Sequence, residues 1–354
     1  MSFDAPVADV PLAPLTTLGV GGAARWFARV LPGRPVRKAY EWAAARELPV
    51  FVLGGGSNLV VADEGFPGLV VQIRGTRITS LRRGDDILVT AGAGEPWDAL
   101  VAYAVEGGLA GVECLSGIPG TVGGTPIQNV GAYGQEVADV IEVVTAFDVE
   151  QQRTVVLSAA ECEFGYRMSR FKGRDAGRFV VSSVIFRLRP GPPTIKYPDV
   201  VEYLARQGKT APDLADARSA VLAIRRRKGM VIDAGDPDTR SVGSFFMNPV
   251  VDRGVFERIA PAPHYVMDNG AVKIPAAWLI EQSGFARGHV DGRVGLSTKH
   301  PLAIVNRGGA TARDVIHLAR RIKSTVRDRF GIALRPEPVF VGIDDDPDVT
   351  DLRG

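Results

Sequence analysis

Apolar residues recur in the first sixty positions with two different spacings, and the spacings alternate. Residues 35–47 place apolar side chains three and four positions apart after Pro35, which predicts a helix that begins at this proline. Short apolar runs at 25–30 and 50–61 flank the helix and predict strands, the second of which is interrupted by glycines. The pattern therefore predicts a strand–helix–strand unit that contains a loop of bare backbone.

The same alternation continues to about residue 227 and predicts an α/β organisation. The expected elements are a strand at 86–94, a mostly apolar and therefore buried helix at 96–109, a hairpin of long strands at 140–158, a strand at 178–190 and a polar, helical connection at 198–227. The Asp-, Gly- and Pro-rich run at 233–241 then predicts a boundary.

The clearest helix in the last third is expected at 311–330. Its apolar residues lie three and four positions apart, Thr311 and Asp314 resemble a capping box, and Gly331 suits the stop. The acidic tail that follows, residues 346–354, is expected to be frayed.

Composition narrows the possible functions. The net charge of +2 gives no argument for a nucleic-acid or membrane partner. Cys114 and Cys162 form neither a disulfide framework nor a metal-ligand pattern, and the four histidines are scattered, so no metal site is expected. Residues 1–30 lack the pattern of a signal peptide, and no run of about 20 apolar residues occurs. A cytoplasmic location without a membrane span is the resulting expectation.

Two uncharged glycine loops carry the first chemical signal. The loops are LGGGSN (53–58) and GIPGTVGG (117–124). Such loops expose backbone N–H groups and let a ligand approach closely, although either one alone could be a tight turn. Neither is a P-loop or a dinucleotide-binding fingerprint. Together they favour a large, flat, phosphate-bearing cofactor, such as a flavin nucleotide.

Several motifs, in this order, resemble those of UDP-N-acetylenolpyruvoylglucosamine reductases (MurB). They are VLGGGSNLVV, SGIPGTVGGTPIQNVGAYGQE, CEFGYRMSRFK, GSFFMNP, KIPAAWLIEQSG and RPEPVF. The resemblance covers residues 15–341 and points to the type I subclass. It implies a two-lobed FAD-binding domain of the vanillyl-alcohol-oxidase (PCMH) type, followed by a C-terminal α+β substrate-binding domain.

The resemblance also implies a division of the chain. The first FAD-binding lobe would span 1–77, and the second 78–227 with a tyrosine-loop insertion at 190–227. The substrate-binding domain would span 228–345, before the acidic tail. The implied reaction is the NADPH-dependent reduction of UDP-N-acetylglucosamine enolpyruvate to UDP-N-acetylmuramate, a step of peptidoglycan precursor synthesis.

The glycine loops are the implied FAD site. No histidine lies in them, so FAD is expected to bind non-covalently, with NADPH as the hydride donor. The residues expected to contact the cofactor are Gly54, Gly55, Gly56, Ser57, Asn58, Gly117, Ile118, Gly120, Thr121, Gly123, Gly124 and Arg225.

Three residues match the chemistry of the implied reaction. Arg167 can offer a cationic fork to the substrate carboxylate, because addition of a hydride creates an enolate-like dianion there. Glu337 lies between two prolines, and our hypothesis is that it is protonated during the reaction and donates a hydrogen bond. Ser244 is expected to protonate the enolate. From local sequence alone, the alternative interpretations are a surface ion pair for Arg167, a solvated carboxylate for Glu337 and a helix-cap or turn serine for Ser244.

Five further residues are implied to bind the substrate: Tyr166, Tyr197, Lys228, Asn248 and His300. Lys228 also fits a solvated helix end, and His300 a structural histidine. Met247 stands where many relatives have lysine, which removes a positive charge from the motif.

Two other functions fit parts of the pattern. One is another FAD oxidoreductase of the same fold, such as a sugar or alcohol oxidase; the joint presence of Ser244 and Glu337 argues against it. The other is a non-catalytic nucleotide-sugar-binding protein, against which the retention of Arg167 also argues.

Overall fold

The chain divides into two units in a computed structural model that describes residues 5–267 and 269–354. Of the described residues, 5–10, 24–56 and 67–231 belong to unit 1, and 11–23, 57–66, 232–267 and 269–354 belong to unit 2. Residues 1–4, which the predicted first lobe includes, lie outside the described residues. The division into lobes at 77 and 227 stays a prediction.

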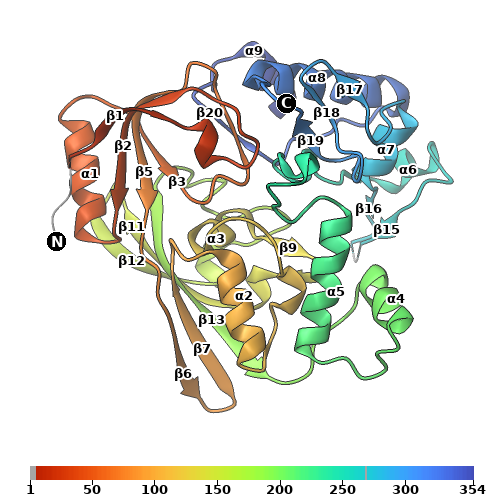
Figure 1. Cartoon of the computed structure of the whole chain (residues 1–354), viewed down its shortest axis with the longest axis horizontal. Coiled ribbons are helices and arrows are strands. Elements are labelled where there is room, and N and C mark those ends of the chain that lie inside the picture. Colours follow the sequence, from red (N-terminus) through yellow and green to blue (C-terminus); the bar gives the residue numbers. More distant parts are fainter. Residues whose placement is uncertain (1–4, 268) are drawn as a thin grey trace. The chain divides into compact units, whose positions relative to one another are not determined.

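Unit 1 contains two main sheets (Figure 1). One has the order β1-β2-β5-β3, and the other has the order β12-β11-β13-β7-β6, with β8 paired to β13. The strands are β1 (Val7–Pro11), β2 (Ala23–Val30), β3 (Val50–Leu53), β5 (Phe66–Ile73), β6 (Ile78–Arg83), β7 (Asp86–Gly92), β8 (Leu109–Ala110), β11 (Ile141–Asp148), β12 (Arg153–Ser158) and β13 (Phe179–Pro190). The predicted hairpin is confirmed, because β11 and β12 pair antiparallel from Val143↔Ser158 to Asp148↔Arg153.

Helices cover these sheets and connect their strands. They are α1 (Arg34–Ala44), α2 (Trp97–Glu106), α3 (Thr125–Gln128), α4 (Pro198–Arg206) and α5 (Leu214–Arg227). Between them lie short 3-10 helices, labelled η, and two short strands. The 3-10 helices are η2 (Glu113–Leu115), η3 (Val122–Gly124), η4 (Val137–Asp139) and η5 (Ala160–Cys162), and the strands are β9 (Gly131–Ala132) and β10 (Gln135–Glu136).

Helix α2 is buried, as its apolar sequence predicts. Trp97, Leu100, Val101 and Ala104 lie in a core shared by residues of both sheets. The indole N–H of Trp97 donates to the carbonyl of Leu115 at 3.0 Å, so the one polar group of this side chain is satisfied inside the core. That bond ties α2 to the segment that leads into the second glycine loop.

The helical connection predicted at 198–227 consists of two helices, α4 and α5. Gly208 ends the first with a left-handed φ of 71°, and Asp213 begins the second by accepting a hydrogen bond from the N–H of Asp216 at 2.8 Å. The break lets α4 fold back on α5 around the buried residues Val200 and Val221.

Unit 2 is built around the long helix α8 (Ala312–Phe330). The predicted capping box is confirmed, because the side chains of Thr311 and Asp314 each accept from the backbone N–H of the other residue. Gly331 ends the helix with a left-handed φ of 69°. The other elements are η1 (Ala13–Leu15), β4 (Leu59–Val61), η6 (Pro237–Thr239), β14 (Val250–Val251), α6 (Arg253–Glu257), β15 (Tyr265–Val266), β16 (Val272–Lys273), α7 (Ala276–Gln282), β17 (Val290–Asp291), β18 (Val294–Leu296), β19 (Ile304–Asn306), β20 (Val339–Val341) and α9 (Pro347–Arg353). Its sheets are β14-β16-β15, β17-β18-β19 and the parallel pair β20-β4.

The expectation of a frayed tail is wrong. Residues 347–353 form α9, whose Val349 and Leu352 are fully buried in the unit 2 core beside α8 (Figure 1). The ammonium group of Lys323 donates to the carbonyl of Leu352 at 3.1 Å, near the end of this helix. Both apolar side chains pack in the same core as residues of α8, and their burial helps to hold the segment in place.

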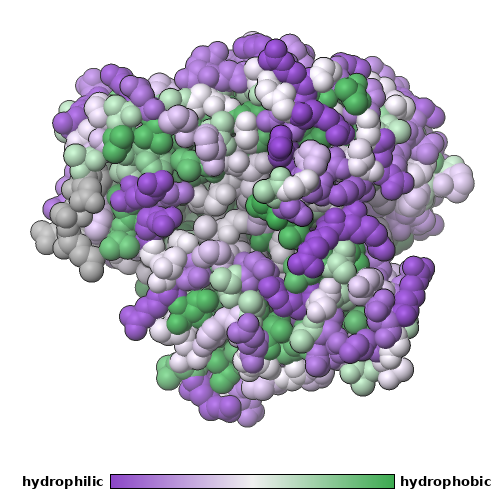
Figure 2. All heavy atoms as spheres, viewed as in Figure 1, coloured by the Kyte–Doolittle hydropathy of each residue, from purple (hydrophilic) through white to green (hydrophobic). Residues whose placement is uncertain are grey.

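Within the described parts of the chain, no helix has both the length and the apolar character needed to cross a bilayer. Among the same residues, no group of histidine, cysteine and acidic side chains could hold a metal ion. Hydrophilic residues cover much of the face in Figure 2, with small apolar patches between them.

Candidate active site

The glycines of the first loop lie against the second loop in unit 1. A Cβ atom on Gly55 would come within 2.6 Å of the Cα atom of Gly120, and one on Gly54 would come within 3.1 Å of the hydroxyl oxygen of Thr121. A side chain at 55 would therefore separate the loops, and one at 54 would push against the Thr121 side chain. Glycine is needed here for loop-to-loop contact, and this contact gathers the amides of both loops in one place.

Part of the second loop's backbone is satisfied inside the protein. The N–H groups of Gly117 and Gly123 donate to Asp98 at 2.6 Å and to the carbonyl of Ala93 at 2.9 Å. The N–H groups of Ile118, Gly120 and Thr121 have no hydrogen-bond partner among the residues that the structure describes. Three donors in one turn of uncharged backbone can donate hydrogen bonds to an anionic or carbonyl-bearing ligand.

Asp98 holds this loop in position, and the sequence analysis did not identify it. One carboxylate oxygen accepts from both the N–H of Gly117 and the guanidinium of Arg218, and the other oxygen accepts from Arg218 at 2.8 Å. Burial opposes ionisation of Asp98, but the bonds from Arg218 and Gly117 outweigh it and hold the pKa of this carboxyl below its usual value. The fork joins α2, α5 and the glycine loop.

Gly123 and Gly124 differ in what their Cα atoms face. A Cβ on Gly123 would come within 2.7 Å of the Cβ of Ala93, so glycine is required there by the protein itself. A Cβ on Gly124 would meet no described atom within 4 Å. Of the two predicted cofactor residues, only Gly124 therefore presents an open face.

The predicted residues Ser57 and Asn58 belong to unit 2. The amide of Asn58 donates to the carbonyl of Glu337 at 3.2 Å, and its own carbonyl accepts from the N–H of Val339 at 2.9 Å. Asn58 is thus joined to the backbone around a predicted catalytic residue, a contact that local sequence does not reveal.

Ser244 and Glu337 occupy neighbouring positions on paired segments of unit 2. The N–H of Glu337 donates to the carbonyl of Phe245 at 2.8 Å, and the N–H of Met247 donates to the carbonyl of Arg335 at 3.0 Å. The rings of Phe245 and Phe246 are buried and pack edge to face at 5.2 Å. The two phenylalanines anchor the GSFFMNP segment in the core and leave Ser244 half-buried at its start.

Arg167 lies on the backbone of the neighbouring motif in unit 1. Its guanidinium donates to the carbonyl of Gly131 at 2.6 Å and to that of Asn129 at 3.4 Å. Asn129 is buried and donates in turn to the carbonyl of Gly165 at 2.9 Å. Arg167 itself has a φ of 54°, which a non-glycine residue adopts only when its surroundings hold it there. The motifs NVGAYGQE and FGYR thus form one fixed cluster.

Arg225 is 8 % exposed and lies beside Gly117. Its guanidinium donates to the carbonyl of Met230 at 2.8 Å, while its Nε–H group is buried and has no partner in the described structure. Burial lowers the pKa of Arg225, although Tyr133 and Asp98 counteract this effect. A buried donor without a partner points to a missing ligand atom, which agrees with the predicted cofactor role.

Tyr197 and Lys228 meet at Tyr133, a residue that the sequence analysis missed. The rings of Tyr133 and Tyr197 pack edge to face with centroids 5.3 Å apart, and the Nζ atom of Lys228 lies 5.7 Å from the Tyr133 ring centre. Lys228 also donates to Asp199 at 3.0 Å. Burial raises the pKa of Tyr133. Its position in the glycine-rich run GAYG was the available signal.

The remaining predicted substrate residues, Tyr166, Asn248 and His300, each make separate local contacts. Tyr166 is exposed, and the guanidinium carbon of Arg167 lies 5.6 Å from its ring centre. In unit 2, the side-chain oxygen of Asn248 accepts from the N–H of Ala276 at the start of α7. The Nδ1 atom of His300 accepts from the N–H of Leu302 at 3.1 Å. Both contacts give these side chains local structural roles beside the predicted ones.

Comparison with known proteins identifies two matching regions. Residues 236–341 match the family model of the C-terminal domain of UDP-N-acetylenolpyruvoylglucosamine reductase, and residues 34–157 match an FAD binding domain. Together with the mixed helices and strands, these matches confirm the predicted fold class.

Whole-chain comparisons agree. The UDP-N-acetylenolpyruvoylglucosamine reductase of Thermobifida fusca is 48% identical over 95% of this chain and 98% of its own length. That of Mycobacterium tuberculosis is 45% identical over 94% of each. The crystal structure of the reductase (MurB) from Thermus caldophilus has a TM-score of 0.67 and 30% identity, and the match covers 96% of this chain and 100% of that one. The resemblance seen in the motifs is therefore confirmed, and this chain belongs to the UDP-N-acetylenolpyruvoylglucosamine reductase family.

Proposed function

We propose that this chain reduces the enolpyruvyl ether of UDP-N-acetylglucosamine to UDP-N-acetylmuramate, with FAD as its cofactor and NADPH as the hydride donor. The step supplies a peptidoglycan precursor; a cytoplasmic location and a contribution to cell shape and division would follow from it. Family membership supports the activity. The observation that carries the cofactor assignment is the set of donors around Gly117: three loop N–H groups and the Nε–H of Arg225 without a described partner.

These donors fit FAD without a strongly basic loop. A diphosphate or a flavin carbonyl can accept from backbone N–H groups, and the open face of Gly124 leaves room for close approach. Bound FAD would supply the hydride-transfer chemistry between NADPH and the methylene carbon of the substrate. All the other chemistry below belongs to side chains of this chain.

In this proposal Arg167 binds the substrate carboxylate. The carbonyls of Asn129 and Gly131 fix the guanidinium before substrate arrives, so little side-chain freedom is lost on binding. Its positive charge stabilises the negative charge that develops when hydride adds to the double bond.

Ser244 and Glu337 complete the reaction. Ser244 donates its hydroxyl proton to the carbon next to the carboxylate, and Glu337, protonated at this stage, donates a hydrogen bond to the developing dianion. The backbone pairing of Glu337 with Phe245 supports the joint assignment, because it keeps both groups on one rigid ladder. Tyr197, Tyr166, Lys228, Asn248 and His300 remain proposed substrate contacts.

The test begins with the absorption spectrum of the purified protein. A yellow protein is expected that bleaches with NADPH in the absence of oxygen and is reoxidised by the enolpyruvyl substrate. The flavin should dissociate on acid precipitation, since no histidine is available in the loops to link it covalently. Bleached protein that reacts with oxygen but not with the enolpyruvyl compound would instead indicate an oxidase. Protein that binds the nucleotide sugar without bleaching would indicate a non-catalytic binding protein.

A further inference from the structure

A buried acidic residue, Glu113, connects three segments of unit 1 that meet next to the second glycine loop. It lies in η2 and is fully buried. One carboxylate oxygen accepts from the N–H of Gly111 at 2.7 Å. The other accepts from the side-chain amide of Gln135 and from the backbone N–H of Thr194, both at 2.9 Å. Every one of these donors is neutral, so the carboxylate is held by hydrogen bonds rather than by an ion pair with them.

Thr194 is held on both sides of its backbone by the dipeptide Glu113–Cys114. Its N–H reaches Glu113, and its carbonyl accepts from the thiol of Cys114 at 3.8 Å. The thiol stays protonated, because burial, with Glu113 as a second cause, raises the pKa of Cys114 to about 12. The side-chain oxygen of Gln135 accepts from the N–H of Cys114 at 2.8 Å and completes the network. Glu113, Cys114, Gln135 and Thr194 are called the Thr194 clamp below.

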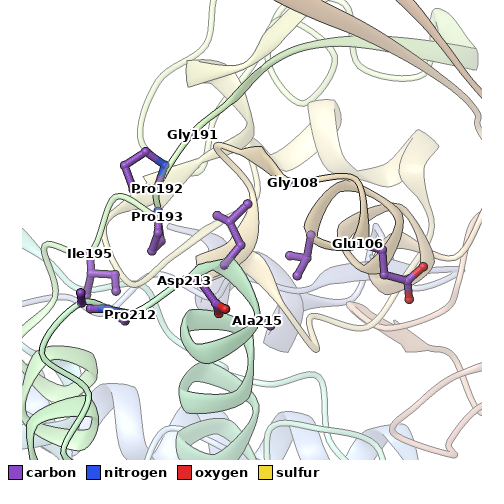
Figure 3. A pocket seen from close by; sticks show the side chains of 12 residues that line it. Glu106, Gly108, Gly191, Pro192, Pro193, Ile195, Pro212, Asp213 and Ala215 are labelled. Carbon is purple, nitrogen blue, oxygen red and sulfur yellow. The ribbon is translucent and has the colours of Figure 1, made fainter.

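The clamped segment carries Tyr197. Residues 191–197 run from the end of β13 to the start of α4 without regular secondary structure. Gly191, Pro192, Pro193 and Ile195 line an open groove of about 760 Å³, with Asp213 and its neighbours at the start of α5 (Figure 3). Protein therefore does not cover this side of the segment. Thr194 does not line the groove. Its backbone N–H and carbonyl are bonded to Glu113 and Cys114 instead.

The clamp ends close to the tyrosine pair. Gln135 lies two residues after Tyr133, whose ring packs on Tyr197. On its other side, the hydroxyl of Ser116 donates to the carbonyl of Glu113 at 2.7 Å, immediately before Gly117. Glu113 thus links these segments in two ways. Its carboxylate joins the GAYGQE turn to the loop that carries Tyr197, and its backbone carbonyl holds Ser116, just before the glycine loop.

We propose that Glu113 is a positioning residue for substrate binding, which acts by seating the 191–197 segment so that Tyr197 is presented on Tyr133. The proposal rests on the proposed function, in which Tyr197 contacts the nucleotide-sugar substrate. Glu113 touches neither cofactor nor substrate in this scheme, so its effect should appear in substrate affinity and not in the reduction of flavin by NADPH.

Glu113→Gln tests this with almost no change in shape. An amide places a donor where an oxygen stood, and it then faces either the N–H of Gly111 or the two donors Gln135 and Thr194. Thr194→Pro removes the clamped N–H from the other end and leaves the buried carboxylate intact. Glu106→Gln is the matched control, because Glu106 is an exposed carboxylate in the groove lining.

The first readout is hydrogen exchange of the backbone amides in 194–197, measured on flavin-loaded enzyme without substrate. Faster exchange is expected in Glu113→Gln and, for the remaining amides, in Thr194→Pro, with no change in Glu106→Gln. The second readout is the Kd of UDP-N-acetylglucosamine enolpyruvate for oxidised enzyme. It should rise roughly ten- to a hundredfold in both clamp variants, as expected for the loss of one hydrogen bond to a charged group. Flavin reduction by NADPH should stay within about twofold.

Two results would overturn the proposal: unchanged exchange in both clamp variants, or faster exchange with an unchanged substrate Kd. If Glu113→Gln fails to retain flavin, Thr194→Pro decides the matter alone. Failure of wild-type enzyme to bind the enolpyruvyl substrate would count against the proposed function. The exchange comparison would still show whether Glu113 seats the segment, so the two failures can be told apart.

Discussion

The backbone N–H of Glu337 donates a hydrogen bond to the carbonyl oxygen of Phe245, with 2.8 Å between nitrogen and oxygen. Ser244 precedes Phe245, and the phenylalanine ring is fully buried. The two acidic groups proposed for the reaction in unit 2 therefore lie on one backbone pairing that the core holds in place. A change that shifts one of them will shift the other, so side-chain substitutions that spare the backbone are the informative ones.

Ser244→Ala should separate the two halves of the reaction. NADPH should still bleach the flavin at a near-normal rate, because that step uses no proton from Ser244. Reoxidation by the enolpyruvyl substrate should slow about a hundred- to ten-thousandfold, the usual cost of losing one positioned acid. Stopped-flow absorbance of each half-reaction provides the measurement.

Ser244→Cys is the matched control, since it keeps a proton donor of similar size and should recover part of the reoxidation rate. Equal slowing of both half-reactions in Ser244→Ala, or slowing of neither, would remove Ser244 as the donor.

Gly123→Val and Gly124→Ala should have different effects, although the two glycines are adjacent. Valine at 123 would overlap Ala93, so the free energy of unfolding should fall by about 1–3 kcal/mol, and less flavin should be retained per chain. Alanine at 124 meets no described atom, so stability should change by less than about 0.5 kcal/mol. Chemical denaturation and the flavin-to-protein absorbance ratio measure the two effects. Unchanged stability of Gly123→Val would show that this loop has been placed wrongly.

Asp98→Asn should remove part of the loss of stability in acid. The pKa of Asp98 is lower in the folded protein than in the unfolded chain, so its charged bonds stabilise the fold above the unfolded pKa of about 4. That contribution is lost as pH falls through the lower, folded-state value. The variant should be less stable than wild type at pH 7, with the difference shrinking below about pH 4. Denaturation curves between pH 3 and 7 would test this, and a constant difference over that range would contradict it.

Deletion of residues 346–354 should destabilise unit 2. It exposes the surfaces that Val349 and Leu352 cover, and it leaves the buried ammonium of Lys323 without its carbonyl partners. Two buried apolar side chains correspond to about 3–6 kcal/mol, so the melting temperature should fall by several degrees or more. Arg353→Ala removes an exposed ion pair with Asp344 and a contact with the Phe340 ring, and it should cost about 1 kcal/mol, well below the truncation. A truncated chain as stable as wild type would restore the idea of a frayed tail.

Features encoded by neighbouring residues could be predicted from the sequence. The capping box of Thr311 and Asp314, the stop at Gly331, the buried face of α2 and the β11–β12 hairpin all follow from signals within a few positions. The motifs identified the reductase family for the same reason, because each is a short stretch of consecutive residues that can be recognised in the sequence itself. The chain alone thus determined its element types, its family and most of the residues proposed for the chemistry.

Tertiary structure decided which supporting residues hold the proposed site residues and beside which of them space is left open. Asp98 meets Arg218 across 120 positions, and Glu113 meets Thr194 across 81, so no local pattern marks either pair. Gly123 and Gly124 look alike in sequence, yet Ala93 closes the space beside one and not the other. The burial of Val349 and Leu352 could not be predicted from the acidic run around them, because it depends on the surface of α8 that they pack against. Hydrogen bonding and close packing depend on distances in space, which the order of residues along the chain does not state.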